Sequence, residues 1–300
     1  MSDSTILKST ATAAAWRQFG LAAAVLALVF CVPLWHLLSL ALADDLQSHI
    51  PLMPLVSLYM VWVRKNTLPD TSAPAGKAAA VFSGISLAVL AWCWLAPVTG
   101  INGLALTTLA FVLFLTGAGC WRLGGALMRA LAFPFALLLF MVPFPLSVRD
   151  GIETFLQHGS AVVADGMFRL AGTPLFRDGM LFHLPGMDIK VAPECSGIHS
   201  TLVLLITSLV AGQLLLQRPW KRWLLCLVVL PLALLRNGFR VFVIGELCVH
   251  VGPRMIDSPI HHKGGPIFFV LSLVPFFLLL YLLREKHRAV QTGQPAKSKN

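Results

Sequence analysis

Long apolar runs, most of them close to the length that a bilayer requires, dominate this chain. A hydrocarbon core of roughly 30 Å needs about 20 helical residues at 1.5 Å each. Eight runs reach or approach this length, so the pattern predicts an all-α polytopic membrane protein of about eight spans. The expected spans are residues 20–43, 50–63, 78–97, 101–120, 126–143, 196–216, 223–248 and 266–283.

The basic residues predict how these spans are oriented, because Lys and Arg collect in cytoplasmic loops. When eight spans are threaded, all basic clusters fall on one side, which we assign to the cytoplasm. They are Lys8 and Arg17; Arg64, Lys65 and Lys77; Arg122 and Arg129; Arg218, Lys221 and Arg222; and Arg284, Lys286 and Arg288. The loops over residues 146–194 and 249–265 are then expected outside.

The external loop 146–194 has patterns of its own. Apolar residues recur at helical spacing over residues 152–170, which predicts an amphipathic helix in the external interface. A ninth span here would instead put the basic cluster at residues 218–222 outside. Beyond it, the turn dipeptides Asp178-Gly179 and Pro185-Gly186 and an alternating stretch over 188–191 predict a small β-hairpin or meander that leads to Cys195.

Composition supports the membrane class and excludes others. With 57% hydrophobic and 12% charged residues and a mean hydropathy of +0.79, the chain is unlike a soluble domain. The net charge of +10 lies in short clusters beside apolar runs, so we expect no nucleic-acid partner. The six cysteines show no CxxC spacing, so we expect neither a metal site nor a cofactor.

Cys195 is the candidate nucleophile, because it stands at the start of the apolar run 196–216. Unpaired backbone N–H groups and the helix dipole favour a thiolate at such a position. On the predicted topology, Arg240 and the pair His261-His262 return to the same outer face. A thiol, a guanidinium that stabilises negative charge and an imidazole that moves protons together describe acyl transfer through a thioester.

The spacing leaves several roles open. His199 shares a helix face with Cys195 and competes with His261 or His262 as the base. Glu194 either disfavours the thiolate or binds a basic group of the substrate. Arg236, Asn237 and Arg240 share one face of their helix, and in a purely structural alternative they pair with carboxylates such as Glu246 or Asp257.

The residues around these positions resemble the exosortase/archaeosortase family. The resemblance rests on three segments in order, and the likeness also covers Met141 to Pro145 and Gly172 to Leu184 before them. The segments are Val191-Ala192-Pro193-Glu194-Cys195-Ser196-Gly197-Ile198-His199-Ser200, Asn237-Gly238-Phe239-Arg240-Val241 and His261-His262-Lys263-Gly264-Gly265. The family's catalytic Cys, Arg and His would then be Cys195, Arg240 and His261. His261 is chosen over His262 because it stands four residues before Gly265, and the family commonly has Arg where this chain has His199.

The resemblance implies a cysteine transpeptidase in the bacterial inner membrane, with its active site on the periplasmic side. Its partners would be the lipid bilayer, membrane-anchored proteins with C-terminal sorting signals of the PEP-CTERM type, and an unknown acceptor, often in bacteria that make exopolysaccharide. One domain over residues 1–300 is expected: N-terminal spans (13–145), a periplasmic helix and β-element (146–194), catalytic spans (195–284) and a cytoplasmic tail (285–300).

A non-catalytic alternative is a membrane component of exopolysaccharide assembly or export. In that case Arg236 and Arg240 would bind an anionic lipid-linked glycan, and the thiol of Cys195 would be dispensable.

Overall fold

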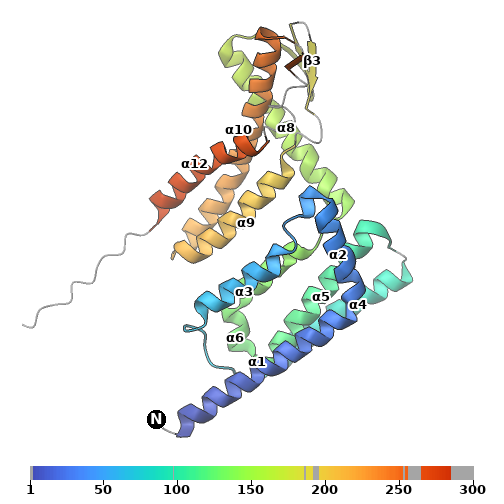
Figure 1. Ribbon diagram of the computed structural model, residues 1–300, viewed down its shortest axis with the longest axis vertical. Helices are drawn as coiled ribbons and strands as arrows, with labels where there is room; N and C mark the ends of the chain where they lie inside the picture. Colours follow the sequence, from blue (N-terminus) through green and yellow to red (C-terminus); the bar gives the residue numbers. More distant parts are fainter. Residues whose placement is uncertain are drawn as a thin grey trace, which may run out of the picture. The chain divides into compact units, whose positions relative to one another are not determined.

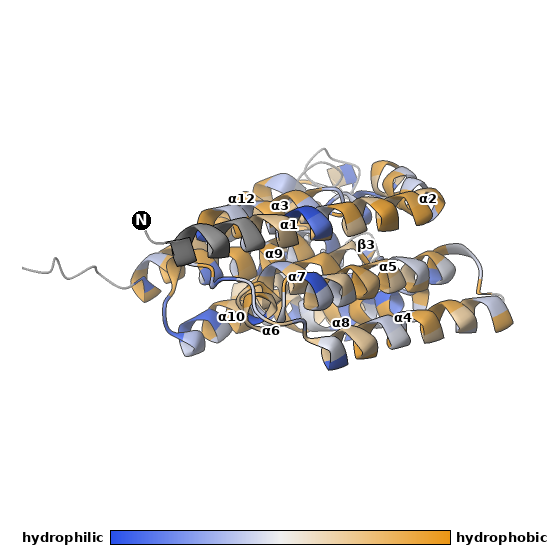
Figure 2. Cartoon of the chain, turned by 90° about the horizontal axis from the view of Figure 1, so that it is seen from below, coloured by the Kyte–Doolittle hydropathy of each residue, from blue (hydrophilic) through white to orange (hydrophobic). Residues whose placement is uncertain are grey.

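A computed structural model describes residues 3–96, 98–185, 187–191, 196–252, 254–255 and 265–284, with the backbone alone for residues 3–11. The chain divides into two compact units, Met1–Gly151 and Ile152–Asn300. Figure 1 labels the elements, and Figure 2 shows that hydrophobic residues cover most of the helices.

The first unit is entirely helical among its described residues. Helices α4 and α5 form a hairpin and pack more extensively on each other than any other pair in this unit, and α1 packs against α5. Ser86 of α4 donates a hydrogen bond to the Ala110 carbonyl of α5 at 2.6 Å. The elements are α1 (Asp3–Val29), α2 (Cys31–Ala43), η1 (Asp45–Gln47), α3 (Leu52–Arg64), α4 (Gly76–Leu95), α5 (Gly100–Arg122), α6 (Gly125–Ala130), α7 (Ala132–Leu137) and η2 (Leu138–Met141).

The second unit combines long helices with one small sheet. Helix α8 (Leu146–Ala171) begins before the boundary between the units and continues into this one. The remaining elements are β1 (Phe176–Asp178), β2 (Leu181–Leu184), β3 (Met187–Lys190), α9 (Ile198–Leu215), α10 (Pro219–His250) and α12 (Gly265–Leu283).

The helices confirm the predicted all-α polytopic fold. Among the described residues, seven helices are long and apolar enough to cross a membrane, or eight if one bent pair forms a single span. That pair joins Ala132–Met141 to Leu146–Ala171 at an angle of 93°. The run 126–143 is therefore a set of short helical pieces and not the straight span predicted for it.

Proline explains the break in one predicted span and is accommodated within another. Pro33 has no N–H to donate to the carbonyl of Val29, and α1 ends at Val29. The run 20–43 is consequently two helices separated by Phe30. In the run 126–143, Pro134 stands at the third residue of α7, where a helix tolerates the loss of a donor because the first N–H groups have no intrahelical partner.

Helix α10 is the centre of the second unit, with α9 and α12 packed against it (Figure 1). A buried cluster joins all three, made of Leu204, Leu216, Leu225, Val229, Phe276 and Leu280. At one end of this bundle, Arg222 donates to the Leu216 carbonyl at 2.8 Å and Lys221 donates to the Leu283 carbonyl at 2.8 Å. The basic loop, the cluster at residues 218–222 that is predicted to be cytoplasmic and runs into the first turn of α10, thus also caps the ends of α9 and α12.

The predicted β-meander is present as a three-stranded antiparallel sheet in the order β1-β2-β3. The chain turns between β1 and β2 at Asp178-Gly179, as that dipeptide predicted, and β2 pairs with β3 on either side of the second dipeptide, whose Gly186 lies outside the described residues. The buried face of the sheet packs on α8 and α10, through Phe182, Leu184 and Ile189. The opposite end of α10 from the basic loop therefore carries this sheet.

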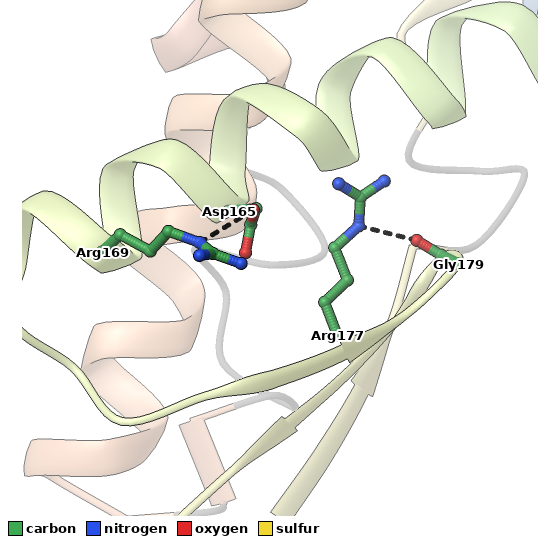
Figure 3. A network of polar contacts seen from close by, with 4 residues as sticks. All are labelled: Asp165, Arg169, Arg177 and Gly179. Carbon is green, nitrogen blue, oxygen red and sulfur yellow. Dashed lines mark hydrogen bonds and ion pairs between the residues drawn. The ribbon is translucent and has the colours of Figure 1, made fainter.

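Helix α8 contains the helix predicted over residues 152–170 and extends it at its N-terminus. Its contacts with α10 advance in the same direction along both helices, from Gly159 at Leu234, through Val163 at Gly238, to Phe168 at Gly245. Figure 3 shows the polar side of α8, where Arg169 pairs with Asp165 at 3.1 Å, and the Arg177 side chain of β1, which points toward this helix while donating to the Gly179 carbonyl at 2.8 Å.

Phe168 is the residue on which this packing depends most, because it is fully buried and its ring contacts those of Phe182 and Phe242. We expect Phe168→Ala to lower the free energy of unfolding by about 3–5 kcal/mol, since it leaves a cavity between α8, the sheet and α10. Thermal unfolding in detergent measures this. Leu170→Ala, at a residue 91% exposed in the same helix, is the control and should change it by less than about 0.5 kcal/mol.

Candidate functional site

The start of α9 has a backbone conformation that requires glycine. Gly197 precedes the helix with φ +69°, in the left-handed region, and Cys195 is two residues before it. The side chains of Ser200 and Thr201 donate to the Gly197 carbonyl at 3.0 and 2.8 Å. Ser196 is buried. The chain that emerges from Cys195 therefore enters α9 through a tightly bonded turn.

Arg236 of α10 holds this turn from the side. Its Nη2 lies 3.3 Å from the Gly197 carbonyl oxygen and 3.5 Å from the Thr201 hydroxyl. A Cβ added at Gly197 would lie 2.8 Å from the same Nη2. A larger residue here would displace the guanidinium from this position, in addition to straining the backbone at φ +69°.

Asn237, the next residue of α10, links this helix to α8. Its Nδ2 donates to the Ser160 hydroxyl at 3.0 Å, and both side chains are buried. Gly238 brings the backbones of the two helices together, because a Cβ there would lie 3.0 Å from the Ser160 carbonyl oxygen. Two consecutive side chains of α10 therefore contact both α8 and the head of α9.

The head of α12 lies beside the same part of α10. The rings of Phe268 and Phe239 have their centroids 6.1 Å apart in an edge-to-face arrangement. Phe239 immediately precedes Arg240, and Phe268 lies in the first turn of α12, seven residues after His261. Described residues within or next to the three sequence motifs thus meet at residues 236–240 of α10.

The predicted site residues divide into two groups. Cys195, Glu194, His261 and His262 lie outside the described residues. Arg236, Asn237 and Arg240 lie on α10 as the spacing predicted, Arg236 and Arg240 being one helical turn apart on one face, and His199 is half-buried in the first turn of α9.

Arg236 does not form the ion pair with Glu246 that the structural alternative predicted. Glu246 accepts hydrogen bonds from the Thr173 hydroxyl and from His250, the latter at 3.0 Å. Asp257, the other carboxylate of that alternative, lies outside the described residues. Within the part of the chain that the structure describes, no cluster of three His, Cys, Asp or Glu side chains has the geometry of a metal site.

The hydrogen bonds of Arg236 return less free energy than its burial costs, which argues against a purely stabilising role. An Arg within a span costs about 2.5–3.5 kcal/mol on insertion scales. A good hydrogen bond from a charged donor returns about 1.5–3 kcal/mol, but the two made by Nη2 are long. Nη1 is buried without a hydrogen-bond partner among the described residues, which costs about 1–3 kcal/mol more.

This arrangement agrees with a comparison of the chain with protein families. Residues 41–278, well over half of the chain, match the family described as transmembrane exosortase. The chain belongs to the transmembrane exosortase family. Searches of curated proteins and of solved structures gave no match. The match includes all three segments on which the sequence resemblance was based.

Sequence reasoning missed two residues of this candidate site. The sequence marks Ser160 only as a position of the helix expected over residues 152–170, and Thr201 only as a position within the apolar run 196–216. Both contact α10 residues more than 30 positions away in the chain, at Asn237 and Arg236. No local spacing signals such a pair, whereas Gly197 stands inside the motif that carried the resemblance.

Gly197→Ala tests the turn. The left-handed conformation costs an alanine about 1–2 kcal/mol, so we expect a loss of that size in the free energy of unfolding. Unfolding of the purified exosortase in detergent measures it. Gly166→Ala is the matched control, because Gly166 lies within α8 with nothing near its Cβ position, and helix propensity should raise its stability by about 0.5–1 kcal/mol. Equal effects at the two glycines would contradict the assignment.

Proposed function

We propose that this exosortase is a membrane-embedded cysteine transpeptidase that cleaves the C-terminal sorting signals of exported proteins. Cys195 is the nucleophile, Arg240 stabilises the developing negative charge and His261 moves the proton. The observation that carries the proposal is the meeting of the described flanks of all three motifs over residues 236–240 of α10. Family membership over residues 41–278 supports it further.

The proposed reaction proceeds through a thioester. The Cys195 thiolate forms a bond to the carbonyl carbon of the scissile peptide, and the negative charge moves to the carbonyl oxygen beside Arg240. The C–N bond then breaks, and the leaving amine takes a proton from the His261 imidazolium. The acceptor gives its proton to His261, bonds to the carbonyl carbon and releases the thiolate.

The substrates are proposed to be membrane-anchored proteins ending in a short Pro-containing motif, a transmembrane helix and a basic tail. The basic loop that caps α9 and α12 supports a cytoplasmic position for that end of the bundle, because Lys and Arg are retained inside. The heads of α9 and α12 are at the other end, so the active site is proposed to face the periplasm from the inner membrane.

Cys195→Ala tests the reaction. We expect processing of a reporter with a C-terminal sorting signal to fall by at least about a thousandfold, because no thioester can form. Cleavage and acceptor transfer are measured by mass spectrometry of the released reporter, alongside Cys226→Ala as the matched control. A non-catalytic component of exopolysaccharide export would tolerate the change at Cys195. If the reporter cleaved by the unaltered protein ends in a free carboxylate, the enzyme is a simple protease that transfers the acyl group to water.

Labelling tests the orientation. In a variant whose only cysteine is Cys195, a membrane-impermeant maleimide should react in cells whose outer membrane alone is permeabilised. A second variant lacks all native cysteines and carries Gln217→Cys, next to the basic loop. It should react only after the inner membrane is opened. The reverse pattern would refute a periplasmic active site.

A further inference from the structure

Arg236 is the buried group of the second unit whose role neither the reaction nor the packing explains. It is 8% exposed, and its described contacts are the Gly197 carbonyl and the Thr201 hydroxyl. Neither acceptor is charged. A side chain chosen only to fill this space would not need a guanidinium, because the shape can be filled by an apolar residue.

We propose that Arg236 is a positioning residue that fixes the turn carrying the nucleophile. The inference rests on the proposed function, because it assigns a task only if Cys195 reacts. Gly197 is held by α10, and each further residue of the chain can extend only about 3.8 Å from the last. Restricting Gly197 and Ser196 therefore restricts how far the sulfur of Cys195 can move from the other reacting groups.

The neighbouring contacts make Arg236 a fixed reference for this turn. Asn237 is bonded to Ser160, and Gly238 lies against Val163, so α10 cannot shift at this level without disturbing α8. Phe239 contacts Phe268 of α12. The turn before α9 is therefore tied to the segment of α10 that ends at Arg240. Through Phe239, the same segment also contacts the head of α12, which follows the motif of His261.

Arg236→Gln, Arg236→Lys and Thr201→Val test this role in the full-length protein in detergent. Arg236→Gln removes the clamp, and we expect kcat for the sorting-signal reporter to fall about a hundredfold while KM changes by less than about threefold. Arg236→Lys keeps one charged donor and should recover part of the loss. Thr201→Val keeps the shape and the Arg236–Gly197 contact but removes the bonds of the Thr201 hydroxyl to both Arg236 and Gly197, and should lower kcat by about threefold to tenfold.

Hydrogen exchange supplies a readout that does not depend on turnover. Amides at residues 198–201 should exchange at least about tenfold faster in Arg236→Gln, while those at 204–215 keep their rates. Arg169→Gln, an exposed arginine of α8 that pairs with Asp165, is the control and should change neither exchange nor kcat. If Arg236→Gln does not fold, Arg236→Lys and Thr201→Val decide the matter by the same two measurements.

Three outcomes overturn the inference: unchanged exchange at 198–201, faster exchange with an unchanged kcat, or a raised KM with kcat intact, which would make Arg236 a substrate-binding residue. Failure of the proposed function is distinct, since an active Cys195→Ala protein would refute that proposal whatever Arg236 does.

Discussion

The second unit depends on one constraint: a charged guanidinium is held inside an apolar helix bundle by neutral oxygen atoms. Arg236 donates to the Gly197 carbonyl and the Thr201 hydroxyl, and its Nη1 is buried. A charge in such a place must be surrounded by polar partners or compensated elsewhere. The surrounding elements are arranged accordingly, with the α9 turn on one side and the bonded pair Asn237 and Ser160 beside it.

Close backbone approach makes this arrangement possible. Gly238 and Gly245 allow α8 to lie against α10, where larger residues would meet Val163 and Phe168. Phe168 in turn supports the sheet through Phe182. The sheet carries the chain to Val191, which is buried in the same cluster and directly precedes the segment of Cys195. The described residues on either side of positions 192–195 are thus both held by contacts, Val191 in this cluster and Gly197 by Arg236.

The two ends of the bundle serve different purposes. At the basic end, Lys221 and Arg222 donate hydrogen bonds to the last carbonyls of α12 and α9, so basic side chains complete these helices. At the other end, polar groups are placed where helices begin.

The sequence by itself determined the class and most elements. Span length, basic clusters and turn dipeptides predicted the polytopic fold, the helix over residues 152–170 and the meander, because these depend on local periodicity and backbone preference. The motifs around Cys195, Arg240 and His261 indicated the family. Tertiary structure alone decided that residues 126–143 form bent pieces, that Ser160 meets Asn237 and that Arg236 holds Gly197. Those contacts join residues far apart in the chain, and their partners are selected by how helices pack, which no local pattern of residues records.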